Sequence, residues 1–525
     1  MTSHDSSIRR LRPLAPIERL VEALTDPARR ERTAVGVLVA YGLCWTLYGV
    51  LAKGNQGVHY DMAELVMWAR EPALGYPKHP PLAAWLVRGW FSLFPCADWA
   101  FYLLAITFAS LALWLAWRLF AHFLEPEKRV LALALLTLIP FFNFLVLKFD
   151  HNAVLMPLWP LATLCFLRSF ETRTGGWAAA AGAAAALAML GKYWSIFLLA
   201  GLGVAALADP RRGAYFRSRA PWITVAVGAL VLSPHLAWLV THDFVPFAYV
   251  RYAHELDYLT AVRSVGGYLA GAAGYVALPV LLVLVASRPS RAALDHMLDP
   301  QPGDRRFVAA GFWLPLLLPC LVALATGIEV SSTWTGAGWT LLPVVLLASP
   351  LIAISRQAIL GIVAFAVVLP PLMTAAAPAI ALAAHRAGGV PPPAAQGRLL
   401  AERLMQEWRQ VTDRPLRLVG GELDLSYTTA FYLPDRPVAL PIGMPQLAPW
   451  VDAERIAREG ISLLCYSRDD DAGGRTCVHH GMIESFEALA RAPGSRHVEV
   501  EIRHSYLGVP GYAVRYFIFT VPPQK

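Results

Sequence analysis

The sequence predicts a polytopic α-helical membrane protein that carries a soluble α/β domain at its C-terminal end. Of the 525 residues, 56% are hydrophobic and 16% are charged, and the mean hydropathy is +0.47. This composition is too apolar for a soluble globular protein. Long apolar runs alternate with short arginine clusters up to a proline-rich break, VPPPAAQG at 390–397, after which the composition changes.

A membrane helix needs roughly 20 mostly apolar residues. On this basis we expect about eleven membrane helices, near residues 33–52, 98–118, 130–147, 153–169, 177–190, 194–208, 221–240, 266–287, 307–327, 338–354 and 357–383. The runs 177–190 and 194–208 are short, and only Gly191, Lys192 and Tyr193 separate them. They are typical of a hairpin of incomplete spans, and the alanine-rich first run favours close backbone packing.

The arginine distribution predicts the orientation, because cytoplasmic loops are enriched in Lys and Arg. An arm at 1–32 carries seven arginines, and the turns near Arg118, Arg168, 211–219, 288–306 and Arg356 fall on the same side. We therefore expect a cytoplasmic arm at 1–32, a transmembrane domain at 33–389 with an extracytoplasmic loop at 53–97, and an extracytoplasmic domain at 390–525. Most of the arginines behind the net charge of +8 lie in these clusters between apolar runs, where they mark the cytoplasmic side. No nucleic-acid partner is therefore predicted.

The tail combines a helical pattern at 394–411 with short β-rich runs at 417–421, 461–467, 497–502 and 516–521, which predicts a small α/β domain. It contains no catalytic motif. Cys44, Cys96, Cys165 and Cys320 lie in or beside apolar runs and are expected to pack there. Cys465 and Cys477 favour a disulfide if the tail is extracytoplasmic, with a free pair as the alternative.

The stretch HYDMAELVMWAREPALGYPKHPPLAAWLVRGW at 59–90 is the strongest candidate for a site. It brings Asp61, Glu64, Arg70, Lys78 and His79 next to apolar segments. Charges near the membrane are costly unless they face water, each other or a ligand. The alternative is a surface-lying amphipathic helix, in which Asp61 and Glu64 are solvated and Trp68 is an interfacial anchor.

Three segments resemble the family 39-type glycosyltransferases, which include protein O-mannosyltransferases and lipid A aminoarabinose transferases and have the GT-C membrane fold. The first is Asp61 with Trp68 and GYPKHPPLAAWL at 75–86, and the second is LKFDHNAVLMPLWPLATLCFLR at 147–168. The third is MLGKYWSIFLL at 189–199. The resemblance implies a bacterial inner-membrane enzyme that moves a sugar from a polyprenyl-phosphate donor to a glycolipid, glycan or protein acceptor in contact with membrane lipids.

Two departures from the family pattern remove negative charge. Met62 follows Asp61 where relatives commonly have a second acid, and Lys78 stands where they commonly have an acidic residue. If relatives use those carboxylates for a divalent cation, this chain has fewer ligands for one. We therefore expect no required metal or other cofactor and leave a divalent cation open. The charge of Lys78 would instead help to neutralise a phosphate.

The resemblance assigns Asp61 as the general base of an inverting displacement and Asp150 as the second carboxylate. It assigns Lys192 and His79 to the donor phosphate, with Lys78 and Arg251 as supporting cations. The expected substrate cavity further includes Glu64, Tyr76, His151, Tyr193, His254 and Glu255. For each of these residues a purely structural role, such as a snorkelling lysine or a solvated loop carboxylate, is the competing interpretation.

Two other functions fit many spans with buried charges. A transporter or flippase of lipid-linked sugars would be favoured by inverted repeats, and the sequence shows no convincing internal repeat. A non-catalytic relative whose tail binds glycans is disfavoured by the presence of Asp61 and Lys192.

Overall fold

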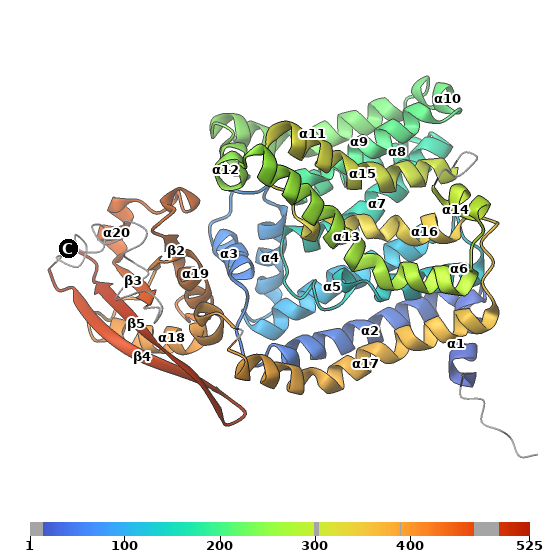
Figure 1. Cartoon of the computed structure of the whole chain (residues 1–525). Helices are drawn as coiled ribbons and strands as arrows, with labels where there is room; N and C mark the ends of the chain where they lie inside the picture. Colours follow the sequence, from blue (N-terminus) through green and yellow to red (C-terminus); the bar gives the residue numbers. More distant parts are fainter. Residues whose placement is uncertain (1–13, 299–303, 389, 467–492, 525) are drawn as a thin grey trace, which may run out of the picture.

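The chain forms a bundle of membrane helices and a smaller C-terminal sheet domain (Figure 1). The computed structural model describes residues 14–298, 304–388, 390–466 and 493–524. The helices of the first part are α1 (Ala15–Thr25), α2 (Arg30–Ala52), α3 (Tyr60–Arg70), α4 (Leu82–Leu93), α5 (Asp98–Phe120), α6 (Pro126–Thr137), α7 (His151–Thr172), α8 (Gly175–Gly191), α9 (Ile196–Ala208), α10 (Arg212–Phe216), α11 (Ala220–Thr241), α12 (Val245–His254), α13 (Tyr258–Ser287), α14 (Arg291–Leu298), α15 (Asp304–Thr326), α16 (Leu342–Leu347) and α17 (Arg356–Arg386). Short 3₁₀ helices occur at η1 (Pro140–Phe142), η2 (Tyr193–Ser195) and η3 (Ser332–Leu341).

Seven helices in the described part of the chain are long and apolar enough to cross a membrane, namely α2, α5, α7, α11, α13, α15 and α17. They coincide with seven of the predicted runs, so the prediction of a polytopic helical membrane protein is confirmed. Helix α8 and the segment 193–208 are shorter apolar helices, in agreement with the predicted hairpin of incomplete spans. The total of eleven spans stays a prediction.

Two apolar runs differ from the expected continuous helices. In the run 130–147, α6 ends at Thr137 and a 3₁₀ turn begins at Pro140, whose ring nitrogen cannot donate a helical hydrogen bond. In the run 338–354, η3 leads into α16, which has only six residues and begins beside Pro343. Both segments are largely buried within the protein.

The spans pack in a chain of neighbours that places α7 near the centre of the bundle. Helix α2 packs against α5 and α17, while α7 packs against α5 and α8. Helix α8 also packs closely against α11, where a methyl group added at Gly182 would clash with the carbonyl oxygen of Thr224. The alanine-rich sequence of α8 therefore permits the close backbone approach that its composition predicts.

The C-terminal domain is a five-stranded mixed sheet with helices. Its elements are α18 (Pro392–Arg409), β1 (Leu418–Gly421), α19 (Leu423–Tyr432), β2 (Val438–Pro441), η4 (Pro445–Leu447), α20 (Ala453–Glu459), β3 (Ile461–Tyr466), β4 (Arg496–Tyr506) and β5 (Val509–Val521). The strand order is β2-β1-β3-β5-β4, with β1 parallel to β2 and β3, and β5 antiparallel to β3 and β4.

The predicted helix and four predicted strands of the tail correspond to α18, β1, β3, β4 and β5, so the α/β character is confirmed. The short strand β2 had not been predicted. Cys465 on β3 is disulfide-bonded, and Cys477 lies outside the described residues. Cys44, Cys96, Cys165 and Cys320 are free, as expected for cysteines that pack in or beside apolar segments.

Candidate active site

The stretch 59–90 folds as two short helices joined by a turn. Helix α3 is buried along its length, because Met62 to Ala69 are all buried, and it packs against α4 and against α19 of the C-terminal domain. In Figure 1, α3 lies between the membrane bundle and the C-terminal domain. The alternative of a surface-lying helix is therefore wrong, since Glu64 and Trp68 are enclosed by protein on both sides.

Hydrogen bonds tie this stretch to the C-terminal domain. The Arg70 guanidinium donates to the carbonyl oxygens of Ala430 and Pro437, the first at 3.2 Å. The Val58 backbone N–H donates to the Tyr432 hydroxyl at 2.8 Å. These bonds fix both ends of α3 against α19 and the segment that precedes β2.

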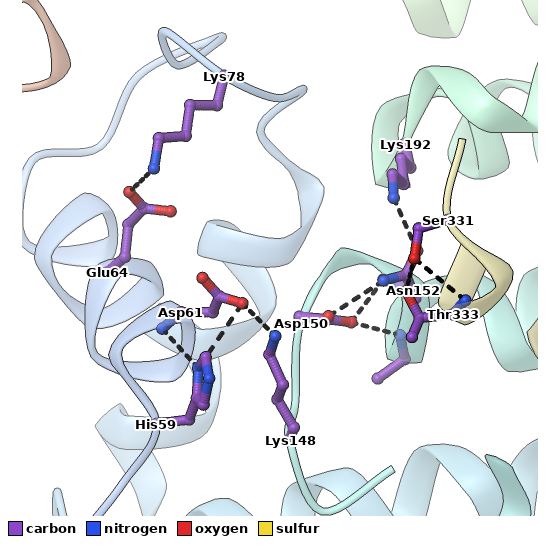
Figure 2. Close-up of polar contacts among 11 residues, drawn as sticks. His59, Asp61, Glu64, Lys78, Lys148, Asp150, Asn152, Lys192, Ser331 and Thr333 are labelled. Carbon is purple, nitrogen blue, oxygen red and sulfur yellow. Dashed lines mark hydrogen bonds and ion pairs between the residues drawn. The ribbon is translucent and has the colours of Figure 1, made fainter. Parts of the chain in front are cut away.

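Asp61 lies in the first turn of α3 and forms an ion pair with Lys148 at 2.5 Å. Its carboxylate also lies 3.7 Å from His59, which caps the helix by accepting a hydrogen bond from the Asp61 backbone N–H (Figure 2). Burial, with the positive charge of Lys148, lowers the pKa of His59 to about 4, although Asp61 opposes this shift. The ring is therefore neutral at neutral pH, and Lys148 supplies the positive charge next to Asp61.

Asp150 precedes α7 and caps it. Its carboxylate accepts hydrogen bonds from the backbone N–H groups of Asn152 and Ala153, at 2.8 and 3.2 Å, and from the Asn152 side chain at 3.1 Å. The sequence order Asp-His-Asn thus places the carboxylate at the positive end of the helix.

Lys192 lies in the turn between α8 and η2, and its ammonium donates to the Asn152 side-chain oxygen at 2.7 Å. The ammonium also lies 4.6 Å from the centre of the Trp334 ring, an arrangement typical of a cation–π contact. Burial lowers the pKa of Lys192 to about 8, although the charges of Asp150 and Asp61 oppose the shift. Asn152 therefore connects Lys192 to Asp150, as Figure 2 shows.

Lys78 and Glu64 form a buried ion pair at 2.6 Å, with side chains that are 9% and 5% exposed. Burial alone would lower the pKa of Lys78, but Glu64, Tyr249 and Asp61 together outweigh burial and raise it. The ammonium also lies 5.6 Å from the ring of Tyr249. Lys78 is thus bound by Glu64, and this ion pair joins the proline-rich turn to α3.

The rings of His79 and His151 are in contact, with centres 3.9 Å apart and planes tilted by 37°. Trp68 lies beside both rings and stacks on Tyr76 at 4.8 Å. Burial, with the nearby positive groups, lowers the pKa of His79 well below its ordinary value. Within the described chain, the buried Nε2 atom of His151 has no hydrogen-bond partner. The His79 ring is therefore neutral at neutral pH, and His151 has a ring nitrogen that can bond to a ligand.

A cavity of about 410 Å³ opens at the start of α3 and of α7. Polar and charged groups on its wall include Lys53, His59, Lys148, Asp150 and Asn152. The rest of the wall is mostly apolar and comes from α3, α5, α7, η3, the segment 141–147 and the C-terminal domain, which also contributes the carboxylate of Asp424. Of the predicted catalytic and phosphate-binding residues, Asp150 lines the cavity, whereas Asp61, Lys78, His79, Lys192 and Arg251 do not. His59 and Lys148, the partners of Asp61, do line it. The cavity can therefore hold a ligand with both an apolar and an anionic part.

The remaining predicted residues lie at the α11–α13 side. The Tyr193 hydroxyl is 2.9 Å from His235 Nε2, and His254 Nδ1 is 3.0 Å from Glu329. Arg251 is exposed on α12. Glu255 pairs with Ile328 through a β-bridge. The ring centre of His254 lies 5.9 Å from that of Trp334, and Trp334 also contacts the Lys192 ammonium. His254 therefore lies near Lys192.

Sequence reasoning did not assign Lys148, Lys53, Asn152 or Trp334 to the site. Lys148 had a signal, because it precedes Asp150 by two residues within the KFDHN segment. Asn152 is in the same segment. Lys53 and Trp334 lie at the ends of structural elements far apart in the sequence, and only the fold brings them to this region.

Within the described ranges, no group of three His, Cys, Asp or Glu side chains is arranged to hold a metal ion. The expectation that no metal or cofactor is required stays a prediction. The Asp61 carboxylate is paired with Lys148, and the Asp150 carboxylate accepts hydrogen bonds from the first turn of α7.

The geometry can be compared with known proteins. Residues 78–238 match the family model described as dolichyl-phosphate-mannose-protein mannosyltransferase. A lipid A galacturonosyltransferase of Rhizobium johnstonii is 28% identical over 211 residues, which are 40% of this chain. The aligned region spans 44% of that relative, so the chain matches less than half of its length.

The fold is similar to that of ArnT from Cupriavidus metallidurans. The structure of ArnT bound to undecaprenyl phosphate superposes with a TM-score of 0.61, at 14% sequence identity, and covers 93% of this chain and 99% of ArnT. The apo structure of ArnT gives a TM-score of 0.60 over the same shares. The chain therefore has an ArnT-like fold, as expected for a membrane-helix domain followed by a C-terminal α/β domain.

Proposed function

We infer that the chain is a GT-C-type membrane glycosyltransferase of the ArnT-like group, which transfers a sugar from a polyprenyl-phosphate donor to an envelope acceptor. The observation that carries this proposal is the cluster of Asp61, Lys148, Asp150 and Asn152 beside a cavity with an apolar wall, on a fold shared with ArnT. The family match and the relative that acts on lipid A support a transferase over a transporter of lipid-linked sugars.

The reaction replaces the bond between the sugar anomeric carbon and the donor phosphate oxygen with a bond to the acceptor oxygen. An acceptor hydroxyl must lose its proton as it attacks, and the lipid phosphate leaves with the bonding electron pair. We assign the proton to Asp61, which lies at the start of α3 beside the cavity-lining residues His59 and Lys148. Attack from the face opposite the phosphate inverts the anomeric centre.

The departing phosphate needs positive charge and hydrogen-bond donors. Lys192 supplies the charge, and Asn152 holds it near the start of α7. We assign the rings of His79 and His151, whose centres lie 3.9 Å apart, to the same phosphate as hydrogen-bonding groups. Asp150 holds Asn152 and thereby positions Lys192. Lys78 stabilises the proline-rich turn rather than binding the phosphate, since its ammonium is paired with Glu64.

Three finer features belong to the same proposal. The donor is a sugar on a polyprenyl phosphate, as suggested by the undecaprenyl phosphate bound in ArnT. The acceptor is an envelope glycolipid, as suggested by the relative named for lipid A. The protein lies in the bacterial inner membrane with the N-terminus in the cytoplasm and the C-terminal domain in the periplasm, as the arginine pattern suggests.

The first experiment compares envelope glycolipids of a deletion strain with those of strains that express the wild type or Asp61→Asn. We expect the deletion to remove one sugar from one glycolipid, the wild type to restore it, and Asp61→Asn to insert normally without restoring it. Asp243→Asn is the matched control, because Asp243 is exposed and its φ of 49° suits asparagine. Full restoration by Asp61→Asn would reject Asp61 as the base.

A further inference from the structure

The hairpin of β4 and β5 ends in a turn with an unusual residue. Tyr506 pairs with Val509, so Leu507 and Gly508 alone form the loop. Both have positive φ values, 48° and 77°. A two-residue loop of this type favours asparagine followed by glycine, because most side chains are strained at positive φ. Leucine is therefore a poor choice for the turn itself.

Contact with water is also unfavourable for the Leu507 side chain, which is 69% exposed at the tip of the β4–β5 hairpin. Neither turn geometry nor packing within the chain accounts for an apolar side chain there. A residue that departs from local preference at an exposed position points to a contact outside the folded chain.

The tip lies beside the ends of two membrane helices. The Tyr506 hydroxyl lies 3.2 Å from the position that a Cβ atom at Gly54 would occupy, two residues beyond the end of α2. His385, in the last turn of α17, contacts the Val509 carbonyl oxygen at 3.0 Å. Figure 1 shows the hairpin extending past the rest of its domain, with its tip next to this end of α17.

We propose that the β4–β5 tip is a membrane contact, in which Leu507 inserts into the interfacial layer of the bilayer at the ends of α2 and α17. Tyrosine is favoured at this depth because its ring is apolar and its hydroxyl is polar. Tyr506, which directly precedes the two-residue loop, is the tyrosine at the tip. Arg386 and Arg503 are exposed close to the tip and suit lipid phosphate groups.

This contact would give the C-terminal domain a second attachment besides α3. The domain holds α3 through Arg70 and Tyr432, while the hairpin would hold the domain to the bilayer. The inference depends on the membrane spans and on the turn, and it does not depend on the proposed sugar transfer.

The test places a polarity-sensitive nitrobenzoxadiazole maleimide on Leu507→Cys in the full-length protein in lipid nanodiscs. The control is Glu454→Cys on α20, whose side chain is 87% exposed. Labelled wild-type protein corrects for reaction at the native cysteines. We expect the label at 507 to show blue-shifted emission and several-fold stronger quenching by nitroxide lipids than the label at 454. Equal, weak quenching at both positions would overturn the proposal.

A second variant separates membrane contact from turn stability. Leu507→Asn suits positive φ, so a role confined to the turn predicts unchanged or slower hydrogen exchange in the hairpin. If Leu507 inserts into lipid, we expect hydrogen exchange at the tip of Leu507→Asn to be about three- to tenfold faster than in the wild type in nanodiscs. This factor corresponds to losing part of the free energy of burying one leucine side chain. Unchanged or slower exchange would contradict membrane insertion.

Discussion

Donor use should weaken as the pH rises through about 8, because Lys192 then loses its charge. Burial lowers the pKa of Lys192 to about 8. The ammonium form binds a phosphate, and the neutral amine does not replace that charge. The protonated fraction of a group with this pKa falls from about 90% at pH 7 to about 10% at pH 9. We therefore expect kcat/KM for the donor to fall about tenfold between these values.

The matched variant is Lys192→Arg, because arginine stays protonated throughout this range. Its kcat/KM for the donor should be lower than that of the wild type at pH 7, since the guanidinium does not reproduce the contact with Asn152. Between pH 7 and 9, however, the variant should lose much less of its remaining activity. The assay is sugar transfer by purified protein at varied donor concentration with acceptor in excess. An equally steep alkaline decline in wild type and Lys192→Arg would refute the assignment.

Two further predictions concern stability. Glu64→Met or Lys78→Met alone should lower the free energy of unfolding by about 3–5 kcal/mol, because each leaves a buried unpaired charge. The double variant should lose clearly less than the sum of the two single losses. Denaturant unfolding of all variants in one detergent measures this, and additive losses would contradict it. His59, with a folded pKa of about 4, should make stability decrease as the pH falls from 6.5 to 4, because the unfolded chain takes up a proton that the folded chain does not. The variant His59→Asn keeps a side-chain acceptor that can cap α3. Between pH 6.5 and 4 the Tm of this variant should fall less than that of the wild type. An equally large fall in Tm would exclude His59 as the cause.

The spans could be predicted because a bilayer requires about 20 apolar residues in each crossing helix. The same criterion failed to predict the ends of the run 130–147, since hydropathy does not separate an apolar segment buried in protein from one that faces lipid. Residues from Arg129 to Leu136 are buried by neighbouring elements, and the chain turns at Pro140. Pro140 was the available local signal for that break.

The site was predictable as a region and less so as a set of contacts. The segments around Asp61, Asp150 and Lys192 were identified from their motifs, and the structure brings them to one cavity and its border. The pairing of Lys78 with Glu64 joins a turn to a helix 14 residues earlier, and no local spacing rule predicts it. The contact of Lys148 with Asp61 depends on how the start of α7 packs near α3, which is a property of the tertiary fold.

The C-terminal domain has a physical role in the site even though its sequence contains no catalytic motif. Helix α3 has only 11 residues, and helices of this length are marginal in water without tertiary packing. Its buried side chains contact the membrane bundle and α19, and Arg70 bonds to carbonyl groups beside α19 and β2. If the domain separated, α3 would lose one of its two packing surfaces and these bonds. Asp61 would then lose the support that fixes it beside Lys148, so the geometry of the site depends on the docked domain.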